Sequence, residues 1–195
     1  MATVAGIVLA GGSSTRFGSD KLRASYRGRP LLRHAIDAVA AVSEDVVVVM
    51  GPGADGGGLP PGARLAHDST EGEGPLAGLH AGLLAAVRSD VAVVVAGDMP
   101  DVPPAVLEAL IGVVEGGPAT ASALGTTAGP SPVPIALRTW PAADAVHTLL
   151  HAGRRRLGDV LDVLDTAVIE EARWTSLDPD RRSLFDVDEP SDLER

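Results

Sequence analysis

Cysteine is absent from this chain, and aromatic residues make up only 3% of its 195 positions. The lack of cysteine excludes a disulfide framework, a thiolate nucleophile and a cysteine metal site, and it favours a reducing cytoplasm as the compartment. So few aromatic side chains cannot supply a row of stacking platforms for single-stranded nucleic acid. No apolar run approaches the roughly 18 residues of a membrane-spanning helix, and no basic region precedes the first apolar stretch. We therefore expect neither membrane insertion nor export.

Positive charge is also scarce. Lysine and arginine together number 16, against 26 aspartates and glutamates, and the net charge at pH 7 is -10. This balance argues against non-specific binding to nucleic acid or to an anionic membrane, because basic surface supplies that attraction. An anionic nucleotide would have to meet a local cluster of positive charge. The chain is 45% hydrophobic, which is enough to bury one full core, so we predict a single domain over residues 1–195.

Apolar strand-like runs alternate along the chain with helix-like segments, which is the pattern of βα units around a largely parallel sheet. We expect strands over 4–8, 45–50, 64–67 and 91–96, and helices over 30–42, 76–88 and 103–115. Prolines at positions 130, 132 and 134 argue against a central strand before Ile135. The predicted fold is α/β, with three α/β/α layers and a mostly parallel, twisted sheet. Ligands collect beyond the carboxyl ends of the strands in such a sheet, here residues 9–21, 67–78 and 97–101.

A glycine-containing run, Leu9-Ala10-Gly11-Gly12, follows the first apolar strand, and Arg16 and Lys21 come shortly after it. Paired glycines let backbone N–H groups approach an anion, and the two basic side chains add positive charge for a triphosphate. The spacing matches neither G-x-x-x-x-G-K-[ST] nor a clean G-x-G-x-x-G after the strand. The alternative is a tight turn whose arginine and lysine are solvated. The combination favours a phosphate-binding loop.

A carboxylate follows the apolar run at 91–96, in the sequence Gly97-Asp98-Met99-Pro100. At the exposed end of a strand, Asp98 can hold Mg²⁺, a hard cation that prefers oxygen ligands and often bridges substrate phosphates. The alternative is a turn carboxylate that accepts local N–H groups before Pro100. Because a phosphate-binding loop is expected at the same edge of the sheet, we favour metal binding.

A third segment of interest runs from His67 to Gly78, after the short strand at 64–67. Gly74 and Gly78 allow a close backbone approach, and Pro75 suits the first turn of a helix whose start presents amides to a phosphate. The acidic and hydroxyl residues between Asp68 and Gly74 are better explained as caps of that helix. The segment is a further candidate for contact with a nucleotide.

These motifs together resemble those of a known family. The loop L-A-G-G-x-S-x-R-x-G-x-D-K resembles the signature of nucleotidyltransferases built on the dinucleotide-binding-like fold, and it is most similar to that of the molybdenum cofactor guanylyltransferases. The D-x-P at 98–100, the G-P-L-A-G after Asp68 and the closing element at 184–193 extend the resemblance over nearly the whole chain. It implies a Rossmann-like fold of the nucleotide-diphospho-sugar transferase type. The N-terminal half would bind the nucleotide and the C-terminal half the acceptor.

The resemblance also implies a reaction and a set of roles. GTP would be the donor, molybdopterin carrying molybdenum the acceptor and Mg²⁺ the cofactor, with release of pyrophosphate. The expected catalytic residues are Arg16, Lys21 and Asp98, and the expected nucleotide-binding residues are Leu9, Ala10, Gly11, Gly12, Lys21, Asp68, Gly78 and Asp98. Asp98 would bind the metal, and Asp186 or Asp188 would either supply a second carboxylate or cap the last helix. Arg154, Arg155 and Arg156 would bind the phosphate of the acceptor or form a solvated patch at a helix end.

The sequence departs from the family pattern in two places. Glu189 stands where the family usually has threonine, and aspartates stand where many members have asparagine, which leaves the number of metal ions open. The proline-containing stretch 129–138 lies in the half expected to recognise the pterin, which leaves the acceptor open.

Three alternatives therefore stay beside guanylyl transfer, since phosphate contacts are indifferent to the base. They are a CTP-dependent molybdopterin cytidylyltransferase, another small nucleotidyltransferase acting on a sugar or alditol phosphate, and a non-catalytic nucleotide-binding protein. The expected partners are the two small-molecule substrates. Transient contact with other molybdenum cofactor proteins is compatible with this assignment, whereas nucleic acid and membrane are not expected.

Overall fold

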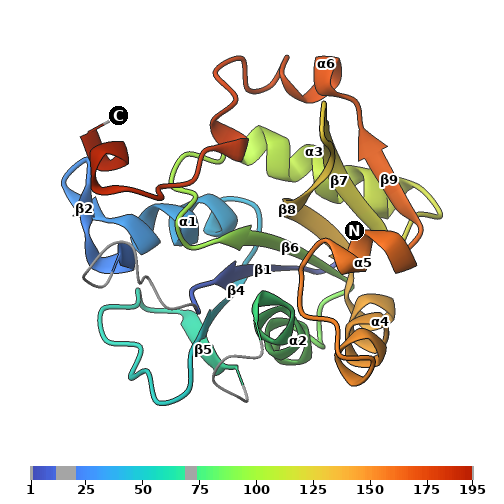
Figure 1. Ribbon diagram of the computed structural model, residues 1–195, viewed down its shortest axis with the longest axis horizontal. Helices are drawn as coiled ribbons and strands as arrows, with labels where there is room; N and C mark the ends of the chain where they lie inside the picture. The colour runs from blue at the N-terminus through green and yellow to red at the C-terminus, as the bar shows by residue number, and fades with distance from the viewer. Residues whose placement is uncertain (1, 12–20, 69–73, 195) are drawn as a thin grey trace.

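The computed structural model describes residues 2–11, 21–68 and 74–194. Within these ranges a seven-stranded sheet, of strand order β5-β4-β1-β6-β8-β7-β9, crosses the molecule with helices on both faces (Figure 1). The strands of this sheet are β1 (Val4–Leu9), β4 (Asp45–Met50), β5 (Ala63–His67), β6 (Val91–Ala96), β7 (Ala121–Thr126), β8 (Gly129–Arg138) and β9 (Thr166–Ile169). A separate hairpin consists of β2 (Ser25–Tyr26) and β3 (Arg29–Pro30).

In the described part of the chain, four longer helices pack on the sheet, and shorter helices lie in the segments before, between and after the larger elements. The longer helices are α1 (Leu31–Ala40), α2 (Pro75–Ala85), α3 (Pro104–Gly116) and α4 (Thr139–His151). The shorter ones are α5 (Asp159–Val163) and α6 (Glu171–Trp174), with 3-10 helices η1 (Lys21–Arg23), η2 (Arg182–Leu184) and η3 (Pro190–Glu194). No helix among the described residues has both the length and the hydrophobicity needed to cross a membrane.

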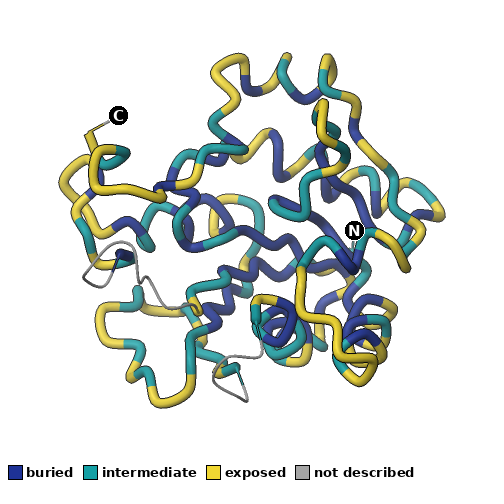
Figure 2. Tube along the Cα trace, viewed as in Figure 1, coloured by how far each residue is buried: buried dark blue, intermediate teal, exposed yellow. Residues whose placement is uncertain are grey.

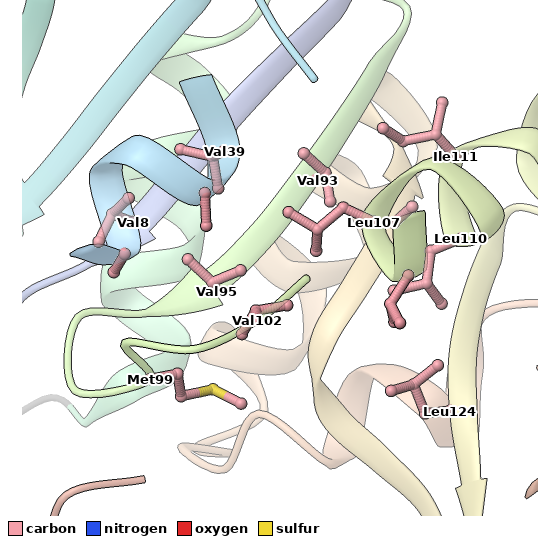
Figure 3. Close-up of a cluster of buried hydrophobic side chains, with 14 of the residues drawn as sticks. Val8, Val39, Val93, Val95, Met99, Val102, Leu107, Leu110, Ile111 and Leu124 are labelled. Carbon is pink, nitrogen blue, oxygen red and sulfur yellow. The ribbon is translucent and has the colours of Figure 1, made fainter. Parts of the chain in front are cut away.

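The valine-rich strands are buried on both faces and divide the core into two layers. β1, β4 and β6 run parallel to one another, and their continuous apolar runs are what a doubly covered strand requires. On one face, Val8, Val93 and Val95 pack against α1 and α3 (Figure 3). On the other, Ile7 and Val49 pack against α2 and α4. These strands form the buried centre of the molecule (Figure 2).

Gly82 lets α2 lie close against this sheet. A Cβ atom at this position would lie 2.7 Å from Ile7 Cγ2 and 3.1 Å from Val49 Cγ2, and the first distance is shorter than real Cβ contacts. The glycine therefore determines how close α2 comes to β1. Because α2 runs back along the sheet from the end of β5, its amino end lies at the carboxyl edge of the parallel strands.

Among the described strands of this sheet, β8 is the one that runs antiparallel to its neighbours β6 and β7, whereas β7 and β9 pair in parallel. Strand β8 pairs with β6 only over Ile135–Arg138, whereas its pairing with β7 extends back to Gly129. The prediction about the prolines is therefore correct for the centre of the sheet, although the strand itself begins earlier than expected. Proline has no N–H to donate to the hydrogen bonds between strands. The proline-bearing part of β8 accordingly lies before Ile135, where β8 pairs with β7 but not with β6.

The strands and helices predicted over residues 4–115 are all present, with bounds that differ by a few residues. The predicted α/β class with a mostly parallel sheet is confirmed. The helix expected after Pro190 is the short 3-10 helix η3 rather than an α-helix.

Candidate functional site

Three segments that are far apart in the sequence meet beyond the carboxyl ends of β1 and β6. Lys21 in η1 donates from Nζ to Asp98 Oδ2 at 2.9 Å and to Asp188 Oδ1 at 3.2 Å. Lys21 is only 8% exposed, and it is the single lysine of the whole chain. The structure therefore brings together a predicted phosphate-binding lysine, the predicted metal carboxylate and one of the two candidate second carboxylates.

The charge on Lys21 is secured by its two partners. Burial by itself would lower the pKa of the ammonium group, but the hydrogen bonds and negative charges of Asp98 and Asp188 outweigh burial and raise the pKa. Lys21 is therefore fully protonated at neutral pH. A buried, protonated ammonium group at the carboxyl edge of the sheet is suited to bind anionic oxygen atoms.

Asp98 is positioned by a tight turn at the end of β6. The N–H of Gly97 donates to the carbonyl of Leu9 at 2.9 Å, which ties this turn to the end of β1. A Cβ on Gly97 would lie 3.2 Å from Leu32 Cδ1 and 3.3 Å from the Leu9 carbonyl oxygen, so a larger residue would push the turn outward. Met99 on the other side of Asp98 is buried in the core (Figure 3). The aspartate is thus held between two anchored neighbours.

The C-terminal segment is fastened to the same turn. The N–H of Val187 donates to the carbonyl of Asp98 at 3.0 Å, and the buried Val187 side chain packs with Tyr26 and Leu31. Asp186 and Asp188 flank Val187, and both are exposed. The pKa of Asp186 is raised by desolvation and by the negative charges of Asp188 and Asp98. Three carboxylates therefore share the neighbourhood of one ammonium group.

The carboxylates of the site can supply some, but not all, of the ligands of a magnesium ion. Among the described residues, no three acidic, histidine or cysteine side chains are placed to hold one metal together. Two carboxylates, those of Asp98 and Asp188, nevertheless share one cation, the Lys21 ammonium. Mg²⁺ is commonly bound through one or two carboxylates, with substrate phosphates and water completing its octahedron. The residues present therefore suit a metal that arrives with a phosphate ligand.

A cavity of about 380 Å³ opens beside these carboxylates. Asp98, Asp186 and the proline-bearing part of β8 all contribute to its lining. The lining residues are Ala96, Asp98, Met99, Thr126, Ala128, Gly129, Pro130, Ser131, Pro132, Val133, Leu184 and Asp186. None of these is basic, and the Thr126 and Ser131 hydroxyls donate to the carbonyls of Gly129 and Val133. The stretch 129–138 was expected in the acceptor-binding half, but none of its residues was predicted to belong to the site, because its prolines were its main signal.

The predicted phosphate loop is only partly within the described residues. Leu9 ends β1, and the N–H of Ala10 donates to the Val49 carbonyl at 2.7 Å, so that amide is occupied within the sheet. Gly11 continues past the strand end, where a Cβ would lie 3.7 Å from the nearest atom, the Gly51 nitrogen. Gly12 and Arg16 lie outside the described residues, and their roles stay predictions.

Asp68 and Gly78 lie on the side of the sheet formed by β4 and β5. Asp68 follows β5, and its N–H donates to the Met50 carbonyl at 2.9 Å. Gly78 lies in α2, and a Cβ there would lie 3.8 Å from Val49 Cγ1, an ordinary packing distance. Neither residue is part of the Lys21–Asp98–Asp188 cluster, so their predicted contact with the nucleotide is a separate, untested part of the site.

The start of α2 differs from expectation. The N–H of Leu76, in the first turn, donates to the Arg155 carbonyl at 3.3 Å. A Cβ on Gly74 would lie 3.1 Å from the same carbonyl oxygen, which shows how closely the two segments approach. The amide at this helix start is therefore occupied by the protein's own backbone rather than directed at a phosphate.

The three consecutive arginines make contacts within their own region. Arg154 forms an ion pair with Asp159, and Arg155 donates from NH1 to the Leu150 carbonyl at 3.1 Å near the end of α4. The N–H of Arg156 donates to Asp159 Oδ2 at 3.2 Å. None of the three lines the cavity or joins the Lys21 cluster. Their expected contact with the acceptor stays a prediction without support from this arrangement.

A buried lysine between two carboxylates, at the carboxyl edge of an α/β sheet and next to a cavity, suits an enzyme that binds phosphate groups. The chain belongs to the MobA-like NTP transferase domain family, whose model matches residues 6–167. This membership confirms the resemblance inferred from the motifs. The predicted class of enzyme, a nucleotidyltransferase connected with the molybdenum cofactor, is thereby confirmed as well.

Individual relatives match over almost their full length. A protein of Chloroflexus aggregans named "Probable molybdenum cofactor guanylyltransferase" is 33% identical, with 97% of this chain and 91% of the relative covered. The "Molybdenum cofactor guanylyltransferase" of Desulfosudis oleivorans is 32% identical over 100% of this chain and 95% of its own. The crystal structure of molybdopterin-guanine dinucleotide biosynthesis protein A from Archaeoglobus fulgidus superposes with a TM-score of 0.79 at 25% identity, covering 98% of this chain and 95% of that one.

Proposed function

We propose that this protein transfers GMP from GTP to molybdopterin, with or without bound molybdenum, and releases pyrophosphate. The observation that carries the proposal is the Lys21 ammonium held by Asp98 and Asp188 at the carboxyl edge of the sheet. The names of the full-length relatives support guanine as the base and the pterin as the acceptor. We further propose that the reaction takes place in the cytoplasm, which agrees with the absence of cysteine.

The proposed reaction is an in-line displacement at the α-phosphorus of the nucleotide. An oxygen of the acceptor's terminal phosphate forms the new P–O bond, and the bond from the α-phosphorus to the oxygen bridging to the β-phosphate breaks. The electron pair of that bond leaves with pyrophosphate. The attacking phosphate is already an anion, so no general base is needed, and none of the described contacts links a histidine to the site carboxylates.

The protein's part in this reaction is to place the phosphates and offset their charge. Lys21 would neutralise charge that builds up on the leaving pyrophosphate, because it is buried, protonated and preorganised. Asp98 and Asp188 would hold Mg²⁺. When bound, the ion would neutralise phosphate charge and orient the phosphates for displacement. The glycine loop and Arg16 are expected to complete the phosphate contacts.

The cavity beside Asp98 and Asp186 would receive the acceptor. Its walls are mostly apolar and include Pro130, Pro132 and Val133, and no basic side chain lines it. It is therefore better suited to the uncharged ring system of an acceptor than to its phosphate. The acceptor's phosphate would then lie at the edge of the cavity where Asp98 stands, on the side of the α-phosphorus opposite the pyrophosphate that Lys21 contacts.

Two measurements on the purified protein test this proposal. Calorimetric titration of GTP, CTP, ATP and UTP with Mg²⁺ gives the base preference, and a pyrophosphate-release assay with molybdopterin gives the reaction. Tight binding of GTP with release only when molybdopterin is added is the expected result. A preference for CTP would make the protein a cytidylyltransferase, and binding without release would make it a nucleotide-binding protein without this activity. The absence of any nucleotide binding would overturn the proposal.

A further inference from the structure

Asp101, three positions after Asp98, joins segments from three parts of the chain. Its Oδ2 accepts a hydrogen bond from the Tyr26 hydroxyl at 2.6 Å, and its Oδ1 accepts one from Arg27 NH1 at 2.9 Å. Arg182 NH1 lies 3.5 Å from Oδ2. One carboxylate thus links the turn after β6, the β2–β3 hairpin and the helix η2 near the C-terminus.

Each of these segments also carries one part of the candidate site. The turn after β6 carries Asp98, and the stretch that ends in the β2–β3 hairpin carries Lys21. The segment after η2 carries Asp186 and Asp188. The contacts of Asp101 therefore run between the same three segments that the Lys21 ammonium joins at the site itself.

The centre of the junction is buried, although its two arginines, Arg27 and Arg182, are partly exposed. The Asp101 side chain is 12% exposed and Tyr26 is 0% exposed, whereas the Asp188 side chain is 58% exposed. Tyr26 belongs to a small buried cluster with Leu31 and Val187, and Val187 lies between the two C-terminal aspartates. Burial together with the hydrogen bond and negative charge of Asp101 raises the pKa of Tyr26 to about 12, which keeps the phenol protonated as a donor.

We infer that Asp101 is a positioning residue, which holds Lys21, Asp98 and the C-terminal aspartates in register through Tyr26, Arg27 and Arg182. The Tyr26 hydroxyl donates to the Asp101 carboxylate in a largely buried setting, where a charge-assisted hydrogen bond is stronger than an exposed one. This contact can therefore fix the position of the segments that carry the exposed carboxylates. Asp101 itself is not among the residues that line the cavity, and it does not contact Lys21. The effect of this role on turnover rests on the proposed function. Its effect on the position and accessibility of Lys21 does not.

The structural consequence is measured on Lys21, because it is the only lysine of the chain. Acetic anhydride modifies Lys21 and the N-terminal α-amine, and peptide mass spectrometry separates the two. In the wild type, burial and two carboxylate partners make Lys21 acetylate slowly. In Asp101→Asn, the amide keeps an acceptor for Tyr26 but loses the charge that holds the two arginines. We expect Lys21 to acetylate at least about threefold faster in this variant.

A matched control is available at the other end of the sheet. Asp45 is the first residue of β4 and accepts two hydrogen bonds from Arg64, from Nε at 2.8 Å and from NH2 at 2.7 Å. Asp45→Asn makes the same chemical change to another arginine-bound aspartate, away from the site. We expect wild-type acetylation of Lys21 and wild-type turnover in this variant. Tyr26→Phe, which removes one hydroxyl from a buried ring, is a second probe of the junction that keeps its packing.

The kinetic consequence is a change in turnover rather than in substrate capture. In Asp101→Asn we expect kcat for pyrophosphate release to fall about 10- to 100-fold, as for misplacement of reacting groups by an ångström or less. The KM for GTP should change less, and the Mg²⁺ concentration for half-maximal rate should rise. Tyr26→Phe should show the same pattern with smaller changes. A loss of folded protein would instead lower the rate of pyrophosphate release per total protein without changing the Mg²⁺ concentration for half-maximal rate.

The outcomes separate the two claims. If Lys21 acetylation accelerates in Asp101→Asn and Tyr26→Phe but not in Asp45→Asn, the positioning role is supported even if the wild type fails to turn over GTP with molybdopterin. If the wild type is active and Asp101→Asn matches Asp45→Asn in acetylation, kcat and Mg²⁺ dependence, the positioning role is overturned while the proposed function stands. If Asp101→Asn does not fold, Tyr26→Phe decides by the same two measurements.

Discussion

Replacing Lys21 with methionine removes the ammonium group but keeps most of the side chain's volume and its unbranched shape. The ammonium lies 2.9 Å from Asp98 Oδ2 and 3.2 Å from Asp188 Oδ1, and the chain has no other lysine. The substitution therefore leaves Asp98, Asp186 and Asp188 without the cation that offsets their charge. We expect it to reduce turnover far more than stability.

The expected loss of stability follows from two unequal ion pairs. The side chains of Lys21 and Asp98 are 11% and 27% exposed, and a hydrogen bond between charged groups in such a setting contributes about 1.5–3 kcal/mol. The Asp188 side chain is 58% exposed, so solvent screening limits its pair to about 1 kcal/mol or less. Methionine avoids the cost of burying an ammonium, which offsets part of both losses. The free energy of unfolding should therefore fall by about 1–2 kcal/mol.

The expected loss of turnover is larger, because the ammonium is proposed to act on charge that develops during the reaction. Removing one preorganised donor from such a position lowers kcat by about 100- to 1000-fold, which corresponds to roughly 3–4 kcal/mol. Turnover is measured as pyrophosphate release with saturating GTP and molybdopterin. Stability is measured by urea unfolding, followed by the fluorescence of the buried Trp174.

Arg64→Met is the control, because it removes a cation from an exposed ion pair with Asp45, away from the site. It should leave turnover unchanged and lower the free energy of unfolding by about 1 kcal/mol or less. A Lys21→Met variant that keeps more than about a tenth of the wild-type kcat would refute the role of the ammonium in the reaction. A loss of stability well above the two ion pairs would instead show that Lys21 holds the segments together and that its effect on turnover is indirect.

Three further predictions concern the metal, the packing of α2 and the acid dependence of stability. Asp98→Ala should abolish Mg²⁺-dependent pyrophosphate release and lower the free energy of unfolding by about 1.5–3 kcal/mol, because it removes the hydrogen bond to the buried Lys21 ammonium, and wild-type turnover would contradict its role at the metal. Gly82→Ala places a Cβ 2.7 Å from Ile7 Cγ2 and should cost about 1–3 kcal/mol in urea unfolding. The matched Gly112→Ala, whose Cβ meets nothing within 4 Å, should be neutral or stabilising by up to about 1 kcal/mol, and equal effects would refute the packing argument. Burial acts to raise the pKa of Asp37, but hydrogen bonds from Arg33 and Arg29 outweigh it and lower the pKa. The stability difference between wild type and Asp37→Asn should thus be complete above the ordinary pKa of 3.8 and should shrink as the pH falls through the lower folded value; a difference independent of pH would rule this out.

The sequence by itself determined the parallel strands β1, β4, β5 and β6 and the helices between them. Continuous valine runs such as Asp45–Met50 and Val91–Ala96 suit strands that are buried on both faces, and the intervening helices follow from local periodicity and from proline at their starts. Because parallel strands align their carboxyl ends, the position of the site at that edge also followed from the sequence. The motifs around Lys21 and Asp98 were sufficient to recognise the family, since such motifs depend on local spacing alone.

Only the tertiary structure decided which of the candidate side chains meet. Lys21 and Asp188 are 167 positions apart, and no local pattern states that the C-terminal segment returns to the turn after β6. The arginines at 154–156 look like anion binders in the sequence, yet Arg154 and Arg155 are engaged with Asp159 and the end of α4. Asp101 carried no signal beyond its closeness to Asp98, because its proposed role depends on a tyrosine and two arginines from distant segments. Local spacing fixes the chemistry that each segment offers, whereas contacts between segments depend on how the buried surfaces pack, and only the folded chain specifies that.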